Sequence, residues 1–162
     1  MKTTPIAPPN CPGFDPKESD FVVSGHADAR YVSQVAGVEL DQDVMVMDSA
    51  ASVLEDFKRS ISPKLAGCLE LQLEKLPNVT SAHVLRVPFP PIGAVTAVYR
   101  AMINVRNGTK RGTLVSDYVF FGEGRTEYEF TVIAPPGARD QLSRFELQLA
   151  QILPHRAPTG TA

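Results

Sequence analysis

A continuous series of strand-like segments, residues 80–133, constrains the fold of this chain more than any other feature. Asn107-Gly108 interrupts the series with the strongest short-range hairpin signal, because a type I′ turn needs positive φ at both central residues. Gly122-Glu123-Gly124 marks a second turn. Strands joined by such short connections are antiparallel neighbours, because a parallel connection needs a crossover of a dozen or more residues. The segment therefore predicts an antiparallel meander.

Helical patterns flank this meander. Asp48 or Ser49 can cap a first helix, and Ser62-Pro63 can start a second, since proline at the first helical position loses no hydrogen bond. Pro77 ends the second helix. A third apolar stripe follows Pro135-Pro136 at helical spacing and comprises Ala138, Leu142, Phe145, Leu149 and Ile152. Two short Val- and Met-rich segments, 20–24 and 43–47, predict further strands.

Together these elements predict an α+β fold, with an antiparallel meander sheet of about four to six strands packed by two to three helices in an α/β/α sandwich. A doubly wound nucleotide-binding fold is not expected. Prolines are concentrated in residues 1–18, which predicts a Pro-rich arm or tether; residues 19–153 form a single domain, and 154–162 a disordered tail.

The charge and hydropathy patterns exclude two classes of partner. Of the 162 residues, 16 are Lys or Arg and 18 are Asp or Glu, and no basic run exceeds Lys110-Arg111. The electrostatic footprint of a nucleic-acid-binding protein is therefore missing. No segment approaches the roughly 18 apolar residues that a membrane-spanning helix needs.

Two cysteines, Cys11 and Cys68, leave two interpretations open. A disulfide between them would close a loop of about 57 residues and tie the N-terminal arm to the body of the domain. Alternatively, Cys68 is a buried thiol on the apolar side of a helix and Cys11 is an exposed thiol. Two widely spaced cysteines do not make a zinc site.

The turns also predict which residues face each other across the meander. A two-residue turn at 107–108 and a three-residue turn at 122–124 place Tyr118 against Tyr128 and Asp117 against Glu129, with Arg100 diagonal to Asp117. One interpretation is a carboxylate pair for metal or acid–base chemistry, because two close carboxylates raise one pKa. The other is an ordinary solvated sheet face, on which Asp117→Asn would relieve like-charge repulsion.

No other catalytic constellation is present in the sequence. The nucleophile elbow, the P-loop, the dinucleotide-binding glycine pattern and the HExxH helix are all missing. His26, His83 and His155 have no metal-ligand spacing to one another. We therefore expect no metal, no cofactor and no enzymatic activity, with the carboxylate pair as the basis of the enzymatic alternative.

Aromatic residues supply the candidate binding walls. Tyr99, Tyr118 and Tyr128 each combine apolar bulk with one polar group, although plain core packing would also account for them. Phe89 lies among Pro88, Pro90 and Pro91. Its side chain either lines the edge of a pocket or packs into the core at a rigid bend of the chain.

Residues 43–153 resemble a known group of proteins. The resemblance is carried by Val44–Met47, Asp48-Ser49-Ala50-Ala51, Phe57, Cys68-Leu69, Pro88-Phe89-Pro90, Ala97-Val98-Tyr99-Arg100, Asp117-Tyr118-Val119-Phe120 and Gly124-Arg125. In the order of these elements the chain is similar to exported actinobacterial proteins and lipoproteins and, more loosely, to PsbP/LpqN-like sandwiches and the extracytoplasmic sensor domains of mycobacterial serine/threonine kinases. The resemblance implies a secreted or envelope-attached, non-enzymatic domain, and it supplies no functional residues.

The leading hypothesis is therefore an extracytoplasmic binding or sensor domain for a small ligand or an envelope component. Its site would lie between the sheet and the helices or under the proline-rich loop. One alternative is a small hydrolase or metal-dependent enzyme that uses Asp117, Glu129 and Arg100. Another is a structural module for protein interaction. The N-terminus lacks the apolar run of a signal peptide, so a cytoplasmic location is the alternative to the cell envelope.

Overall fold

The computed structural model describes residues 11–17, 20–33 and 37–156. Six antiparallel strands form one sheet in the order β1-β2-β6-β5-β4-β3. Their bounds are β1 Val23–Ser33, β2 Val38–Met47, β3 Val79–Val87, β4 Val95–Asn107, β5 Lys110–Glu123 and β6 Thr126–Ala134. The predicted α+β class is confirmed.

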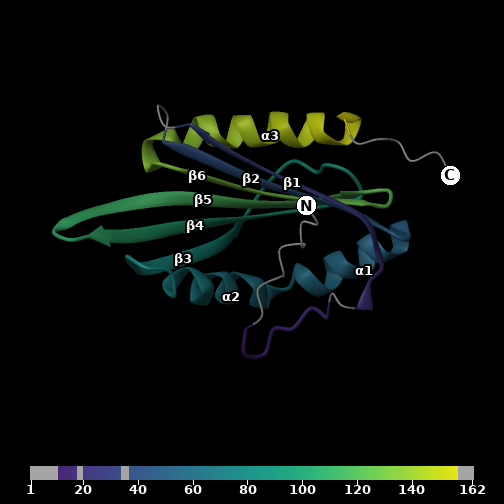
Figure 1. Ribbon diagram of the computed structural model, residues 1–162, viewed down its shortest axis with the longest axis horizontal. Coiled ribbons are helices and arrows are strands. Elements are labelled where there is room, and N and C mark those ends of the chain that lie inside the picture. Colours follow the sequence, from purple (N-terminus) through teal and green to yellow (C-terminus); the bar gives the residue numbers. More distant parts are fainter. Residues whose placement is uncertain (1–10, 18–19, 34–36, 157–162) are drawn as a thin grey trace.

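Helices lie on both sides of this sheet (Figure 1). α1 (Ala50–Ser60) and α2 (Pro63–Glu74) pack below it in that view, and α3 (Arg139–Arg156) packs above, after the short 3-10 helix η2 (Pro136–Ala138). The predicted caps are present: Ser49 accepts from the backbone N–H of Ser52, and Ser62 accepts from that of Lys64. No helix in the described ranges is long and apolar enough to cross a membrane.

Four segments differ from their sequence predictions. β1 and β2 together extend much further than the short strands predicted at 20–24 and 43–47. α3 continues through Pro154 to Arg156, where a disordered tail was expected. At the other end, residues 11–17 do not form a loose arm, because Cys11 and Phe14 are buried against the domain. The rest of the predicted arm and tail, 1–10 and 157–162, lies outside the described residues.

Both hairpin registers differ from the prediction. The β4–β5 turn is at Gly108-Thr109, so Asn107 pairs with Lys110, a shift that keeps each side chain on its predicted face. The β5–β6 turn has two residues instead of three, so Glu123 pairs with Thr126. This odd shift turns the side chains of β6 over relative to those of β5, because side chains alternate between faces with a period of two.

The sheet consequently separates two apolar cores. The core on the α1–α2 face contains buried side chains from α2, β3 and β4, together with Phe14 from the N-terminal segment. The core on the α3 face is built from β2, β4, β5, β6 and α3, with Phe121 and Phe130 fully buried in it.

Candidate functional site

A groove lies between α3 and the outer strands β1 and β2. It has a volume of about 990 Å³, within the range of small-molecule sites. Residues from two strands and one helix line it: Ala29, Arg30, Tyr31, Val32, Ser33, Val38, Leu40, Gln42, Ala138, Gln141, Leu142, Phe145, Leu149, Ile152 and Leu153. Most of these side chains are apolar, so the groove is suited to an apolar ligand.

The width of the sheet explains why the groove exists. Six strands about 4.8 Å apart are more than twice as wide as a helix of about 10 Å diameter. α3 packs mainly against β5 and β6, near the middle of the sheet. Leu40 on β2 is buried in the same core, and the face of β1 beside it is left uncovered. Ala29 presents only a methyl group there, which keeps the space open.

Large apolar side chains remain exposed along the groove. Tyr31 on β1 is 59% exposed, and Phe145 and Ile152 on α3 are 42% and 47% exposed. A contiguous apolar surface in water is unfavourable, and such surfaces mark binding sites in folded proteins.

Charge at the groove is largely compensated. Arg30 is the lining arginine, but its side chain is on the face of β1 opposite α3, where it forms ion pairs with Glu39 and, at 3.5 Å from its Nε to Oδ1, with Asp41. Gln42, Gln141 and Ser33 add neutral polar groups. The groove therefore favours a neutral apolar ligand over an anion.

A buried polar network lies under α3. Arg100 donates to Asp117 from Nε, at 2.7 Å, and from Nη2, and its Nη2 also donates to Ser143 on α3 at 3.0 Å. Asp117 is fully buried and Glu146 is 1% exposed. Burial, followed by the negative charge of Asp117, raises the pKa of Glu146 to about 8. The network ties α3 to the sheet and thereby positions one wall of the groove.

The predicted carboxylate pair does not exist. Asp117 pairs across the strands with Val132, and Glu129 pairs with Phe120, so the two acidic side chains are on opposite faces of the sheet. The prediction was wrong because the turn before β6 is one residue shorter than assumed. Arg100 lies directly opposite Asp117, a closer relation than the predicted diagonal.

Glu129 instead lies among acidic side chains on the α1–α2 face. Burial first, then Asp43 and Asp56, raise its pKa to about 7. Asp43 Oδ2 accepts from His26 Nε2 at 2.8 Å, and Ser60 donates to Asp56 at 3.0 Å. Within the described ranges, no group of three or more His, Cys, Asp or Glu residues is arranged to hold a metal ion.

The predicted aromatic wall is also dispersed. Tyr99, on the α1–α2 face, is 2% exposed and packs edge to face with Phe120. Tyr128, on the opposite face, is 3% exposed and stacks on Phe121, with ring centroids 4.6 Å apart. Since these tyrosines lie on different faces, they cannot line one pocket.

Neither of the other two predicted wall residues lines the groove. Tyr118 is partly buried in the core of the α1–α2 face, and burial raises the pKa of its hydroxyl. Phe89 is partly buried and packs against the core of the α3 face, as expected for a side chain that packs into the core at a bend. His83 lies on the exposed surface, 3.0 Å from Glu70.

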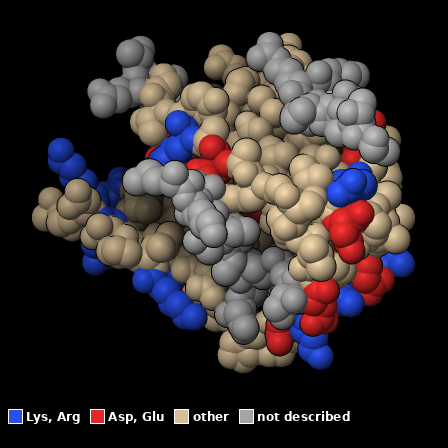
Figure 2. All heavy atoms as spheres, turned by 45° about the vertical axis from the view of Figure 1, so that its right-hand side comes forward, with Lys and Arg blue, Asp and Glu red and all other residues tan. Residues whose placement is uncertain are grey.

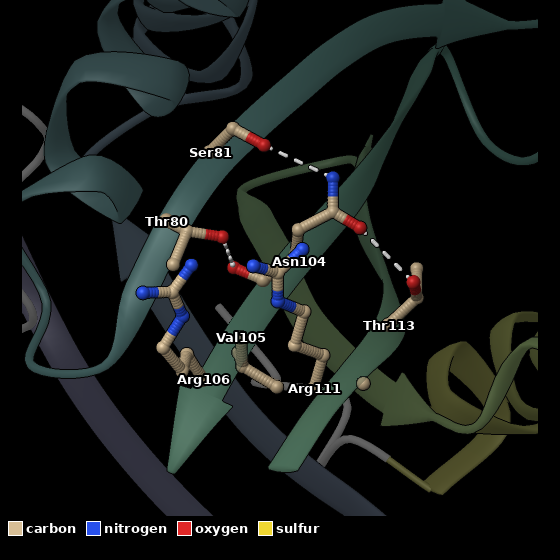
Figure 3. Close-up of a pocket in the computed structure, with 8 residues that line it drawn as sticks. Thr80, Ser81, Asn104, Val105, Arg106, Arg111 and Thr113 are labelled. Atoms are coloured by element: carbon tan, nitrogen blue, oxygen red, sulfur yellow. Dashed lines mark hydrogen bonds between the residues drawn. The ribbon is translucent and has the colours of Figure 1, made fainter. Parts of the chain in front are cut away.

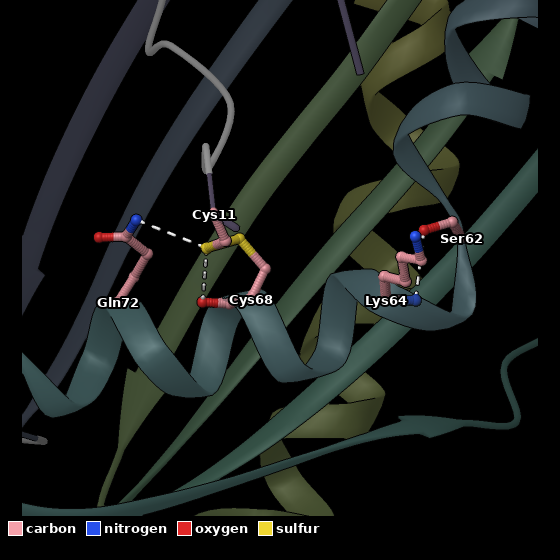
Figure 4. Close-up of a disulfide and its surroundings, with 5 residues drawn as sticks. All are labelled: Cys11, Ser62, Lys64, Cys68 and Gln72. Atoms are coloured by element: carbon pink, nitrogen blue, oxygen red, sulfur yellow. Dashed lines mark hydrogen bonds between the residues drawn. A yellow bond between two sulfur atoms is a disulfide. The ribbon is translucent and has the colours of Figure 1, made fainter. Parts of the chain in front are cut away.

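Cys11 and Cys68 form a disulfide (Figure 4). It joins the N-terminal segment to the middle of α2, where Gln72 points its side-chain amide at Cys11 Sγ, 3.7 Å away. Lys64 Nζ donates to the carbonyl oxygen of Gly13 at 2.9 Å. Of the two interpretations left open by the sequence, the structure contains the disulfide.

The sequence reasoning missed the groove because it missed most of β1 and the first half of β2. Alternation in Ala27, Ala29, Tyr31 and in Val38, Leu40 was an available signal, and Gly37 adopts the positive φ of 62° typical of a turn residue. Small alanines and interspersed charges made the alternation weak.

Comparison of the chain with protein-family models, with curated proteins and with solved structures returned no match.

Proposed function

We propose that this protein is a non-enzymatic binding module that holds a neutral apolar ligand in the groove between α3 and β1–β2. The observation that carries the proposal is a groove of about 990 Å³ that combines an apolar lining with exposed Tyr31, Phe145 and Ile152. Burying these side chains against a ligand gains roughly 25 cal/mol per Å² of apolar surface removed from water.

The occupant best suited to this groove is an extended hydrocarbon chain. Its walls are a helix and a strand pair, which give a long and open apolar surface. The lining arginine is already paired with acidic neighbours, so a charged group would find no uncompensated cation among the lining residues. Gln42 and Gln141 can hydrogen-bond to a neutral polar group, such as a hydroxyl or an ester, at the end of the chain.

An oxidising compartment suits this proposal. Disulfides persist in secreted and envelope proteins and are rare in reducing cytosol, and the Cys11–Cys68 disulfide is therefore a reason to propose an extracytoplasmic location. The resemblance to exported actinobacterial proteins points the same way. The enzymatic alternative loses its basis, because Asp117 and Glu129 do not form a pair.

Binding of the neutral apolar dye N-phenyl-1-naphthylamine tests the proposal. We expect saturable fluorescence enhancement with the wild-type protein. Ala29→Trp fills the groove and should weaken the dye affinity at least about tenfold, a loss of about 1.4 kcal/mol. Ala27→Trp is the matched control, because it is on the same strand and face but outside the groove lining.

Native mass spectrometry and size-exclusion chromatography then measure whether each protein is a monomer or a dimer. Equal dye affinity in the Ala29→Trp and wild-type proteins, or no dye binding by either, contradicts the proposal. If the wild type is a dimer that does not bind the dye, and Ala29→Trp makes it monomeric, the groove is a protein–protein interface and not a ligand site.

A further inference from the structure

Basic charge is concentrated in one part of the chain. Residues 75–116 contain six Lys or Arg residues and no Asp or Glu, while the rest of the chain carries 10 basic residues against 18 acidic ones. Three of the six, Arg106, Lys110 and Arg111, are exposed around the β4–β5 turn. Figure 2 shows basic side chains on the end of the molecule that projects to the left, where Figure 1 places this turn.

Two of these cations face each other. Arg106 pairs across the strands with Arg111, which brings their side chains to the same face of the hairpin. Like charges in this position are destabilising unless an anion lies between them. Arg30 and Arg59, which are also at the surface, each reach two carboxylates, but neither Arg106 nor Arg111 has an ion pair within the described residues.

A polar hollow of about 400 Å³ lies beside this pair. Its wall consists of Thr80, Ser81, Asn104, Val105, Arg106, Arg111, Gly112 and Thr113 (Figure 3). It contains no acidic residue, and its polar side chains are hydrogen-bond donors in excess of acceptors. The groove of the proposed function shares none of these residues.

Hydrogen bonds hold the floor of the hollow in place. The Asn104 side-chain amide donates from Nδ2 to Ser81 Oγ at 3.0 Å and accepts at Oδ1 from the Thr113 hydroxyl at 3.0 Å (Figure 3). Thr80 donates to the Asn104 backbone carbonyl at 3.1 Å. Because Ser81 Oγ accepts from Asn104, its own hydroxyl hydrogen remains able to donate to a ligand.

We propose that Arg106, Arg111 and Ser81 form a binding site for a phosphate group. Two guanidinium groups offer planar pairs of N–H donors, which match the oxygens of phosphate bidentately, and a doubly charged phosphate neutralises both cations. The same site would take inorganic phosphate or the phosphomonoester headgroup of a lipid. The inference goes beyond the proposed function and does not depend on it.

The first arm of the test is calorimetric titration of the full chain with inorganic phosphate at low salt. We expect saturable binding by the wild type and an affinity at least about tenfold lower in Arg106→Gln/Arg111→Gln, in line with the loss of two charge-assisted bidentate contacts. Arg86→Gln/Arg144→Gln is the matched control. It makes the same change in net charge at exposed arginines outside the hollow and should bind phosphate within about twofold of the wild type.

A second arm distinguishes the source of the phosphate. Phosphatidylcholine vesicles with and without phosphatidic acid are sedimented with each variant. If the protein sediments with the vesicles only when they contain phosphatidic acid and both arginines are present, the ligand is a lipid headgroup. If the protein binds inorganic phosphate but does not sediment with these vesicles, the ligand is the free ion.

The proposal is overturned if wild type binds neither phosphate nor phosphatidic acid vesicles, or if the Arg106→Gln/Arg111→Gln variant binds them as well as the wild type does. Thermal denaturation shows whether the double variant is folded. Because both arginines are exposed, their replacement should leave the melting temperature unchanged or raise it. Phosphate should raise the melting temperature of the wild type and not that of this double variant.

Discussion

On one face of the sheet two helices share the covering, with α2 on β3 and β4 and α1 on β2, β5 and β6. On the other face a single helix, α3, packs mainly on β5 and β6. The two-helix face is further closed by residues 11–17, which the disulfide ties to α2. The one-helix face is left open over β1 and β2, where the groove lies. The number of helices available to cover a wide sheet thus decides where a ligand can enter.

The two faces also bury charge differently. Under α3, Arg100 and Asp117 form a matched pair beside Glu146. Under α1, Glu129 lies with Asp43 and Asp56, so acidic groups predominate. The first arrangement holds a helix in position, and in both arrangements a glutamate with a raised pKa makes stability depend on pH.

The largest expected effect is loss of the disulfide on the two-helix face. Cys11→Ser/Cys68→Ser should lower the free energy of unfolding by about 4 kcal/mol, the chain-entropy value for a separation of 57 residues. Urea denaturation measures this loss in the free energy of unfolding. Reductant should destabilise the wild type similarly and leave the double variant unchanged; a loss below about 1 kcal/mol would mean that this closure contributes little.

Asp117→Asn tests the network on the one-helix face. We expect a loss of about 3 kcal/mol, because the buried Arg100 cation loses its carboxylate partner. This reverses the gain in stability expected if Asp117 had faced Glu129. The pKa of Glu146 should fall in this variant, since the charge that raises it is removed. Urea denaturation at several pH values measures both; unchanged stability would show that the pair does not hold α3.

Gly122→Ala probes the packing of α1 on the sheet. A Cβ at Gly122 would lie 2.5 Å from Val53 Cγ1 and 3.0 Å from Val95 Cγ2. We expect a loss of about 2 kcal/mol from overpacking. Gly112→Ala on the same strand is the control, because its Cβ would meet Val105 at an ordinary 3.7 Å. Equal melting temperatures for the two variants would contradict the close approach of α1.

Glu129→Gln should produce the smallest effect, and only at neutral and alkaline pH. The folded-state pKa, about 7, is above the unfolded value near 4.5, so the folded state binds the proton more tightly. The stability of the wild type therefore falls as pH rises from about 4.5 to about 7.

The Glu129→Gln variant lacks this loss and should be more stable than the wild type at pH 8 by on the order of 2 kcal/mol, allowing for partial exposure. Near pH 4 the two proteins should differ little. Melting temperatures across this pH range measure the difference. Glu123→Gln, at an exposed glutamate of the same hairpin, should leave the pH dependence unchanged.

The sequence by itself determined the types of the elements and their antiparallel connection. Caps such as Ser49 and Ser62 act within one helical turn, and the glycines between β4, β5 and β6 act within one hairpin, so these signals are local. The disulfide was one of two open interpretations, because its geometry depends on where Cys11 lies in space.

Only the tertiary structure decided the register of β6, the partner of Asp117 and the location of the groove. The turn at Gly124 is one residue shorter than predicted, and this difference puts Glu129 on the other face of the sheet. The length of the turn is selected by packing on both faces of the sheet and not by the turn sequence alone. The groove likewise depends on which strands α3 covers. Such features arise from contacts between residues far apart in the chain, which local patterns of polarity do not specify.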